Sequence, residues 1–349
     1  MIKNRFYSLD KAEKEALFYA ISNITRMPAF AVEKDWWVVQ TLAIIFEMEI
    51  GSHLVFKGGT SLSKAWGLIE RFSEDIDLAI DRKFLGFEGN LSKNQRTALR
   101  KSAYTYISTK FIVDLKQKFT EKGFSDVTFN LIETSDSDQD PSIIEIYYPN
   151  IIQSLGYIQP RVQLEIGCRS LREPFSFQSF TSVIDKHYPD LNFAQLPIVV
   201  PTVNPERTFL EKIFLLHEEF QKPIDKVRIN RLSRHLYDVF HLSKTHYATN
   251  ALTDKALYET IVIHRYNYTR IGGVDYNLHQ PQSINPIPIP EILEAWNVDY
   301  NTMVEQMIYE QNPPKFNELI SNLTNLKNKI NSIEWKFETQ FPTSLQVPK

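Results

Sequence analysis

The chain lacks the features that mark an exported or membrane-bound protein. Cys168 is the single cysteine among 349 residues, so an internal disulfide is excluded and a reducing compartment is expected. The sequence shows no N-terminal signal pattern, and no apolar run approaches the ~18 residues that a membrane-spanning helix requires. We therefore expect a cytoplasmic protein that has no membrane partner.

The chain also lacks the general excess of basic residues that attracts nucleic acid. Its formal net charge is −3, so any such attraction would have to be local. One segment, 222–234, is locally basic and contains a single acidic residue, Asp225. Its basic residues are Lys222, Lys226, Arg228, Arg231 and Arg234. Such a run is usually a solvated helix face or loop, but it would also suit the backbone of an RNA.

The composition and the order of patterns predict a globular protein with two domains. Hydrophobic residues make up 43% of the chain, which suffices for a core, and 349 residues exceed the usual size of one domain. Strand and helix patterns mix up to about residue 202, and helical patterns dominate afterwards. We expect an α+β fold, with a mixed sheet flanked by helices in residues 1–202 and a mainly helical domain in 203–349.

Periodicity predicts the individual elements. Helices are expected over residues 10–23, 29–48, 60–70, 92–121, 204–220, 230–246, 299–311 and 314–332. Strands are expected over residues 53–56, 74–80, 125–132, 142–149, 159–168, 176–184 and 196–201. The segment 271–290 is rich in proline and is expected to be irregular.

The most informative segment is 53–80, HLVFKGGTSLSKAWGLIERFSEDIDLAI. Asp75 and Asp77 lie two residues apart on a predicted strand, so both project from one face, while Ile76 and Leu78 anchor the other face in a core. Two carboxylates on one strand can hold two divalent cations about 3.5–4 Å apart, as in-line phosphoryl transfer requires. Solvent-exposed strand carboxylates are the alternative interpretation.

A Gly-Gly turn precedes these aspartates. The backbone amides of Gly58, Gly59 and the next residue would open a helix, and a helix N-terminus binds phosphate. Lys57 and Lys64 flank the turn with positive charge, but a Gly-Gly pair alone is also a common turn. The predicted nucleotide-binding residues are Lys57, Gly58, Gly59, Thr60, Ser61 and Ser73.

Three further candidates lie downstream. Glu165, in the strand RVQLEIG, points away from its apolar neighbours and could supply a third metal ligand; an exposed glutamate on an edge strand is the alternative. Lys212 lies off the central apolar stripe of its predicted helix. Asp238 follows Arg234 by four residues and could form an ordinary surface ion pair with it.

Together these blocks resemble the AbiEii/AbiGii-type nucleotidyltransferase toxins, a branch of the DNA polymerase β-like superfamily. The GGT…SEDIDL block is the most specific. The matching blocks are EKDWWV (33–38), FKGGTSLSKAWGLIERFSEDIDL (56–78), VQLEIG (162–167), ERTFLEKIFLLH (206–217), RHLYDVFHL (234–242) and WNVDYNTMVEQMIYE (296–310). The resemblance spans most of the chain.

The resemblance implies a polymerase β-like sheet and a helical domain that completes the active site. It implies that the turn at residues 58–60 holds the triphosphate and that Asp75 and Asp77 bind magnesium. Lys212 would contact phosphate, and Asp238 would position or activate the acceptor. The superfamily often has an aspartate as third metal ligand, so Glu165 departs from that pattern.

Similar proteins are toxins of toxin–antitoxin and phage-defence (abortive-infection) systems, act beside a separate DNA-binding antitoxin, and in some cases add nucleotides to tRNA. We therefore expect a Mg²⁺-dependent nucleotidyltransferase toxin that transfers NMP from an NTP to an acceptor, tRNA, and releases pyrophosphate. Two alternatives remain open: a nucleotide-binding module without catalytic activity, and a two-metal nuclease, which would need similar carboxylates but no triphosphate cradle.

Overall fold

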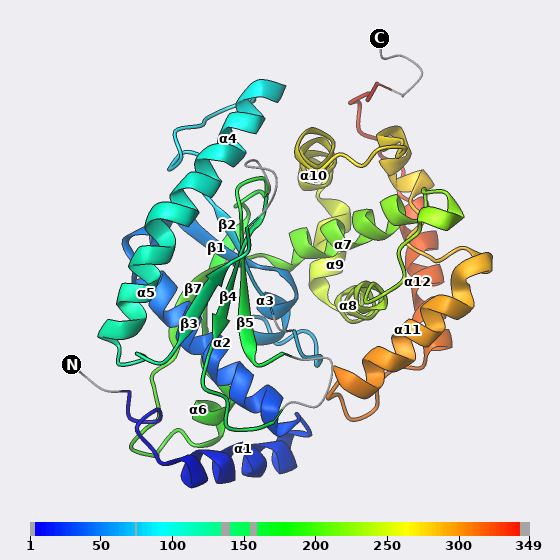
Figure 1. Ribbon diagram of the computed structural model, residues 1–349. Coiled ribbons are helices and arrows are strands. Elements are labelled where there is room, and N and C mark those ends of the chain that lie inside the picture. Colours follow the sequence, from blue (N-terminus) through cyan, green and yellow to red (C-terminus); the bar gives the residue numbers. More distant parts are fainter. Residues whose placement is uncertain (1–3, 74, 134–139, 154–158, 343–349) are drawn as a thin grey trace. The chain divides into compact units, whose positions relative to one another are not determined.

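The computed structural model describes residues 4–73, 75–133, 140–153 and 159–342 (Figure 1). The chain divides into two compact units. Unit 1 comprises Met1–Gly67 and Phe72–Val203, and unit 2 comprises Leu68–Arg71 and Asn204–Lys349. Four residues between two parts of unit 1 therefore fold with the helical C-terminal part of the chain. The division into two functional domains, residues 1–202 and 203–349, stays a prediction.

Unit 1 is built around one seven-stranded sheet, in the order β3-β4-β5-β2-β1-β7-β6. The strands are β1 (Leu54–Lys57), β2 (Asp75–Ile80), β3 (Thr128–Leu131), β4 (Ser142–Tyr147), β5 (Arg161–Gly167), β6 (Phe175–Phe180) and β7 (Ile198–Val203). β2 runs parallel to β5 and antiparallel to β1, and β1 runs parallel to β7. The sheet is therefore mixed, which confirms the predicted α+β class.

One face of the central strands is apolar and fully buried. Ile76 and Leu78 of β2 alternate with the two aspartates, and Leu164 of β5 lies beside Ile76 in register. Helix α2 (Ala29–Glu47) packs against β5 and β7. Most of α2 is buried, including Trp36, because it also contacts α1, α5 and α6. The period-two pattern thus leaves the opposite face for polar side chains.

The other helices of unit 1 largely follow the predicted ranges. They are α1 (Lys11–Thr25), α3 (Gly58–Lys64), α4 (Lys93–Tyr106), α5 (Ile112–Glu121) and α6 (Val183–His187). The predicted helix over 92–121 is α4 and α5 joined by a π-helical turn, Ile107–Phe111. Asp10 and Glu13 form a capping box that opens α1.

Two predicted bounds in unit 1 are wrong. The helix expected over 60–70 ends at Lys64, because Gly67 takes a positive φ of 62° and the indole Nε1 of Trp66 donates to the Val203 carbonyl at 3.0 Å. The strand expected over 176–184 ends at Phe180, because the Ser182 hydroxyl accepts from the Asp185 amide and opens α6.

The described part of unit 2 contains six α-helices and several short 3₁₀ turns. The α-helices are α7 (Pro205–Glu219), α8 (Ser233–Ser243), α9 (His246–Thr253), α10 (Lys255–Tyr268), α11 (Leu293–Gln306) and α12 (Phe316–Asn331). The helix expected over 230–246 is α8, which begins at Ser233 and ends at Ser243, and Thr245 adopts an extended conformation before α9. Helices α9 and α10 were not predicted, and the 271–290 segment forms only short turns.

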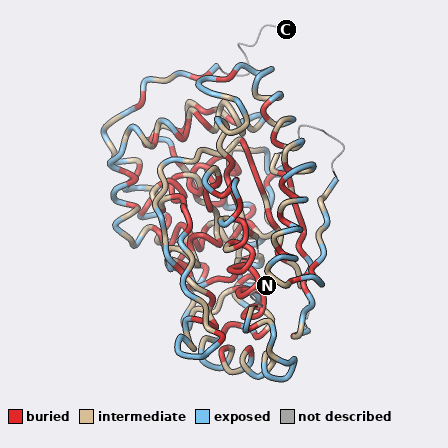
Figure 2. Tube along the Cα trace, turned by 90° about the vertical axis from the view of Figure 1, so that its left-hand side faces the viewer, coloured by how far each residue is buried: buried red, intermediate tan, exposed pale blue. Residues whose placement is uncertain are grey.

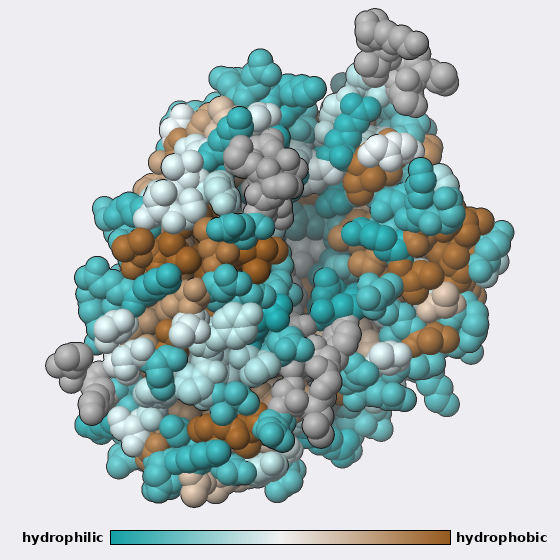
Figure 3. Space-filling model, viewed as in Figure 1, coloured by the Kyte–Doolittle hydropathy of each residue, from teal (hydrophilic) through white to brown (hydrophobic). Residues whose placement is uncertain are grey.

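Buried residues (red) are enclosed by exposed turns and helix faces in Figure 2. The face drawn in Figure 3 is mostly hydrophilic, with separate hydrophobic patches. Within the described ranges, no helix combines the length and the apolar character that crossing a membrane demands.

Candidate functional site

The three predicted carboxylates of unit 1 lie on one face of the sheet. In register, Asp75 of β2 pairs with Gln163 of β5, and Asp77 pairs with Glu165. All three carboxylates are half-buried, whereas the residues between them are buried on the opposite face. Because neighbouring strands lie about 4.8 Å apart, the sheet brings Glu165 beside Asp77. It does so across 88 residues of sequence.

Gly58 places the backbone of the turn directly against Asp77. Gly58 is the first residue of α3 and has a φ of 81°, a conformation that other residues rarely adopt. A Cβ atom on Gly58 would lie 2.0 Å from Oδ2 and 2.8 Å from Cγ of Asp77. Glycine is therefore required here both for the backbone conformation and for space.

The hydroxyls of the turn hold it on strand β2. The Thr60 Oγ1 donates to the Asp75 carbonyl at 2.5 Å, and the Ser61 Oγ donates to the Gly58 carbonyl at 2.9 Å. Both side chains are buried, so these contacts position the turn and strand. Gly59 and Ser73 are partly exposed.

The two lysines of the turn have different environments. The Lys57 Nζ lies 3.8 Å from Oδ1 of Asp77, and both side chains are 24% exposed, so this contact is open to solvent. The Lys64 Nζ lies 2.6 Å from Oδ1 of Asp35 on α2. Asp35 is nearly fully buried and also accepts from the Val183 amide at 2.7 Å. Lys64 therefore fastens α3 to α2, and Lys57 is the lysine available near the carboxylates.

Glu165 belongs to a chain of polar contacts along the same face. The Gln163 Nε2 donates to Glu165 Oε1 at 2.9 Å, and Arg161 Nη2 donates to Gln163 Oε1 at 3.1 Å. Arg161 Nε in turn lies 2.9 Å from Oε1 of Glu145, on β4. Each side chain fixes the next, so Glu165 is oriented by a series of contacts that sequence reasoning had not identified.

The predicted residues of unit 2 form a buried ion cluster. Lys212 Nζ on α7 lies 2.8 Å from Oδ2 of Asp238 on α8. Arg71 binds the same carboxylate in a bidentate manner, with Nε at 2.6 Å from Oδ1 and Nη2 at 2.7 Å from Oδ2. Asp238 is completely buried, and Arg71 is 2% exposed. One carboxylate is therefore shared by two cations.

The charges in this cluster determine the protonation of its members. Burial acts to raise the pKa of Asp238, but Arg71 and Lys212 outweigh it and hold the pKa well below its usual range. Burial lowers the pKa of Lys212, and Asp238 opposes that shift. Burial also keeps the pKa of His235 well below its usual value, so its neutral Nδ1 can accept from Lys212 Nζ at 3.4 Å.

Arg71 is the residue of this cluster that the sequence analysis missed. It lies in the Leu68–Arg71 segment, which belongs to unit 2 through a β-bridge between Arg71 and Ile308 and a hydrogen bond from the Tyr309 amide to the Glu70 carbonyl. In the sequence, Arg234 precedes Asp238 by four residues and was its expected partner. An arginine next to the SEDID block was a visible signal, but its partner lies 167 residues downstream.

The basic run 222–234 is partly neutralised by an acid outside it. Glu219, at the end of α7, is buried and lies 2.8 Å from Lys222 Nζ and 2.7 Å from Arg228 Nη2. Arg228 remains 61% exposed despite this contact, and Lys226 is exposed. The surface that could contact a polyanion is therefore narrower than the sequence suggested.

The donor set on the sheet fits a magnesium ion that shares its ligands with a substrate. Over the ranges that the structure describes, no group of three or more histidine, cysteine, aspartate or glutamate side chains could hold a metal by itself. Mg²⁺ is usually held by one or two carboxylates together with substrate phosphates and water. Asp75 and Asp77 supply such a pair, and all of their donor atoms are oxygen.

The chain is similar to one family of known proteins and to several solved structures. The model of a family described as the nucleotidyl transferase AbiEii toxin, type IV TA system, matches residues 41–322. Among solved structures, JHP933 from Helicobacter pylori is similar at 12% identity and a TM-score of 0.42, covering 86% of this chain and 91% of that protein. A protein described as a candidate nucleotidyltransferase from H. pylori is similar at 12% identity and a TM-score of 0.40, covering 85% and 93%. No curated protein matches the chain.

Proposed function

The chain belongs to the AbiEii nucleotidyltransferase toxin family of type IV toxin–antitoxin systems, and from this premise we propose that it is a Mg²⁺-dependent enzyme that transfers NMP from an NTP to tRNA. Family membership implies an NTP substrate and an antitoxin partner. The proposal adds the metal, the acceptor and the residue roles. The observation that carries it is the contact of the Gly58 backbone with the Asp77 carboxylate, which joins the turn and the carboxylate pair into one site.

In the proposed mechanism, the carboxylates and the turn orient the triphosphate for in-line attack. Mg²⁺ bound by Asp75 and Asp77 would neutralise phosphate charge, with Glu165 as a candidate third ligand. The turn at Gly58 and Gly59 would lie against the β- and γ-phosphates, and Lys57 would add positive charge. Positioning and electrostatic stabilisation account for most of the catalysis in this class of reaction.

We assign the buried cluster of unit 2 to phosphate binding. Lys212 would contact the triphosphate, as the family resemblance implies, and Asp238 would keep Lys212 in place. A lysine buried without a counter-charge would tend to lose its proton. The ion pair at 2.8 Å with Asp238 opposes that loss, and a phosphate contact needs the positive charge.

The proposed acceptor is tRNA, and exposed basic residues support this assignment. Lys226 and Arg228 remain exposed in the segment after α7 and could contact an RNA backbone. Phosphate contacts of this kind carry no sequence information, so they would bind the acceptor without selecting its end. The antitoxin partner is expected to be a separate protein.

The proposal is tested by labelling. The full-length protein is incubated with Mg²⁺, each α-labelled NTP in turn, total RNA and cell extract. Label in RNA of tRNA size, with pyrophosphate release that EDTA abolishes, would support it. Label in protein would reject tRNA as acceptor, shortened RNA would indicate the nuclease, and NTP binding without pyrophosphate release would indicate the module without catalytic activity.

Matched substitutions then test the site. Asp75→Asn and Asp77→Asn keep the size of each side chain and remove its charge, and each should reduce transfer by at least about a hundredfold. Asp190→Asn, at an exposed aspartate of unit 1 outside the proposed sites, is the control and should transfer at the wild-type rate. Wild-type transfer by both site variants would refute the assignment.

A further inference from the structure

Helix α2 carries three consecutive charged residues that are all buried. Glu33 and Lys34 are each 2% exposed, and Asp35 is 4% exposed. They open the EKDWWV block (33–38), to which the proposed mechanism assigns no role. Charged side chains are seldom this deeply buried unless they are paired, because burial removes their hydration. Successive residues of a helix point about 100° apart, so these side chains face different parts of unit 1.

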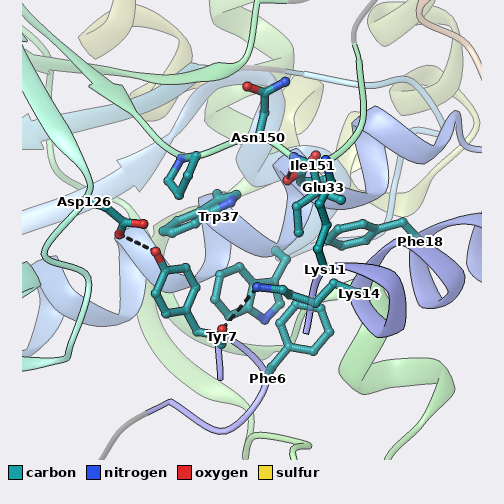
Figure 4. Close-up of a pocket in the computed structure, with 12 residues that line it drawn as sticks. Phe6, Tyr7, Lys11, Lys14, Phe18, Glu33, Trp37, Asp126, Asn150 and Ile151 are labelled. Carbon is teal, nitrogen blue, oxygen red and sulfur yellow. Dashed lines mark hydrogen bonds between the residues drawn. The ribbon is translucent and has the colours of Figure 1, made fainter. Parts of the chain in front are cut away.

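Each of the three side chains holds a different segment. Glu33 accepts from the amides of Ile151 and the next residue at 2.8 and 2.9 Å, and Figure 4 shows it beside Ile151. The Lys34 Nζ donates to the Gln159 carbonyl, just before β5, at 3.1 Å. Asp35 holds α3, which carries the Gly-Gly turn. Of these contacts, that of Asp35 reaches an element of the proposed nucleotide site directly.

The Asp35 carboxylate is fixed by both of its oxygens. Oδ1 lies 2.6 Å from Nζ of Lys64, the last residue of α3, and Oδ2 accepts at 2.7 Å from the amide of Val183, the first residue of α6. The Lys64 side chain is 14% exposed, so the pair is largely shielded from solvent. Hydrogen bonds between charged groups are about twice as strong as neutral ones. The end of α3 is therefore tied to α2 and α6 through one carboxylate.

The orientation of α3 decides where the Gly-Gly turn lies. This helix has seven residues, too few for a helix to be stable by itself, so contacts outside it hold it in place. Thr60 holds its first turn on β2, and Lys64 holds its last residue on α2. An uncharged hydrogen bond from the Trp66 indole to a carbonyl of β7 follows the helix. Loss of the charged contact would let α3 tilt about Thr60, which would move Gly58 relative to Asp77.

We propose that Asp35 is a positioning residue of the nucleotide site: through Lys64 it sets the orientation of α3, and thereby the place of Gly58 against the Asp77 carboxylate. This inference rests on the proposed function, in which that turn and that carboxylate bind one Mg²⁺–NTP. In the opposite interpretation Lys64 binds phosphate directly, so its release from Asp35 would strengthen NTP binding. The two interpretations predict opposite signs for the same substitution.

Matched substitutions on α2 test the proposal. Asp35→Asn and Glu33→Gln each keep the size of a buried side chain and remove its charge, but Glu33 holds a segment outside the proposed nucleotide site. Calorimetry measures the binding of the Mg²⁺ complexes of ATP, GTP, CTP and UTP to the full-length protein without an acceptor. Asp35→Asn should weaken the tightest of them about tenfold, because a displacement near 1 Å in such a site is costly. Glu33→Gln should leave that affinity unchanged.

Hydrogen exchange shows whether Asp35 holds α3, independently of nucleotide binding. The amides of Ala65 and the next residue are bonded to the Ser61 carbonyl at 3.0 and 3.1 Å and report on the last turn of the helix. In Asp35→Asn they should exchange at least about fivefold faster, and in Glu33→Gln at the wild-type rate. If Asp35→Asn does not fold, Lys64→Gln should produce the same acceleration, and Lys64→Arg, which keeps the cation, should restore slow exchange.

Three outcomes would overturn the proposal: unchanged or tighter NTP binding by Asp35→Asn, an equal loss of affinity in Glu33→Gln, or unchanged exchange of the α3 amides in Asp35→Asn. Failure of the proposed function gives a different result. A wild-type protein that binds none of the four nucleotides up to about 10 mM would refute the proposed function, while the exchange rates would still decide whether Asp35 holds α3.

Discussion

Gly58→Ala should disable the enzyme through a clash that the structure locates. The new Cβ would lie 2.0 Å from Oδ2 of Asp77, whereas ordinary contact begins at 3.4 Å, so the carboxylate would have to move by about 1.4 Å. A displacement near 1 Å in an active site can cost about a hundredfold in rate. We therefore expect nucleotide transfer, measured as pyrophosphate release under saturating NTP, to fall by about that factor.

The stability cost of the same substitution has two parts. A positive φ costs alanine about 1–2 kcal/mol. Moving Asp77 off its preferred rotamer adds about 0.5–1.5 kcal/mol. Gly123 offers a matched control, because its φ is 91° and an added Cβ would meet nothing within 4 Å. Gly123→Ala should therefore pay the backbone cost alone and retain full activity.

A double-mutant cycle separates the clash from the strain. In an Asp77→Ala background, most of the colliding side chain is gone, so the cost of Gly58→Ala in urea unfolding should fall to that of Gly123→Ala. The reasoning would be refuted if Gly58→Ala transferred nucleotides at the wild-type rate. It would also be refuted if the two glycine variants were destabilised equally in the wild-type background.

Three further predictions concern the polar contacts of Glu165, the buried ion cluster of unit 2 and the pH dependence of stability. Gln163→Leu removes the side chain that donates to Glu165, so the Mg²⁺ concentration for half-maximal activity should rise about 10–100-fold. An unchanged concentration would show that the chain of polar contacts does not orient Glu165 for metal binding. Arg71→Met leaves Lys212 as the remaining cation of the cluster on Asp238 and should lower the free energy of unfolding in urea by about 3 kcal/mol. A loss below about 1 kcal/mol would contradict the importance of this buried ion pair. Burial lowers the pKa of His217 to about 3, so the contribution of its neutral form to stability is complete above the unfolded pKa of 6.5 and is lost as the pH falls below it. His217→Gln should therefore reduce the slope of the unfolding free energy against pH, between pH 6.5 and 4.5, by up to about 1.4 kcal/mol per pH unit. Identical slopes for the variant and the wild type would refute this prediction.

The sheet and its polar face could be predicted because their signal is local. In β2 the alternation of Asp75 and Asp77 with apolar residues fixes which side chains share a face. The same reasoning on β5 placed Glu165 opposite its apolar neighbours, and strand pairing then brings it beside Asp77. The residue types of neighbouring positions are enough for such inferences.

Contacts between distant segments could not be predicted in this way. The contact of Gly58 with Asp77 depends on the path of the turn over the strand, and the sequence shows only a Gly-Gly pair and an aspartate 19 residues later. Similarly, Glu219 lies just outside the basic run yet binds Lys222 and Arg228. A count of charges within the run therefore overestimated its free positive charge.

The structure narrows the two roles that the family resemblance allows for Asp238. A general base must reach the proton that it removes, and its pKa should lie near the working pH. Asp238 is completely buried, both of its oxygens are bonded to cations, and its pKa is held well below the usual range. We therefore infer that Asp238 positions Lys212 and does not activate the acceptor. Arg71 binds the same carboxylate and so helps to hold Asp238 in place. The segment Leu68–Arg71, between α3 and β2, thus belongs to the unit that contains Lys212.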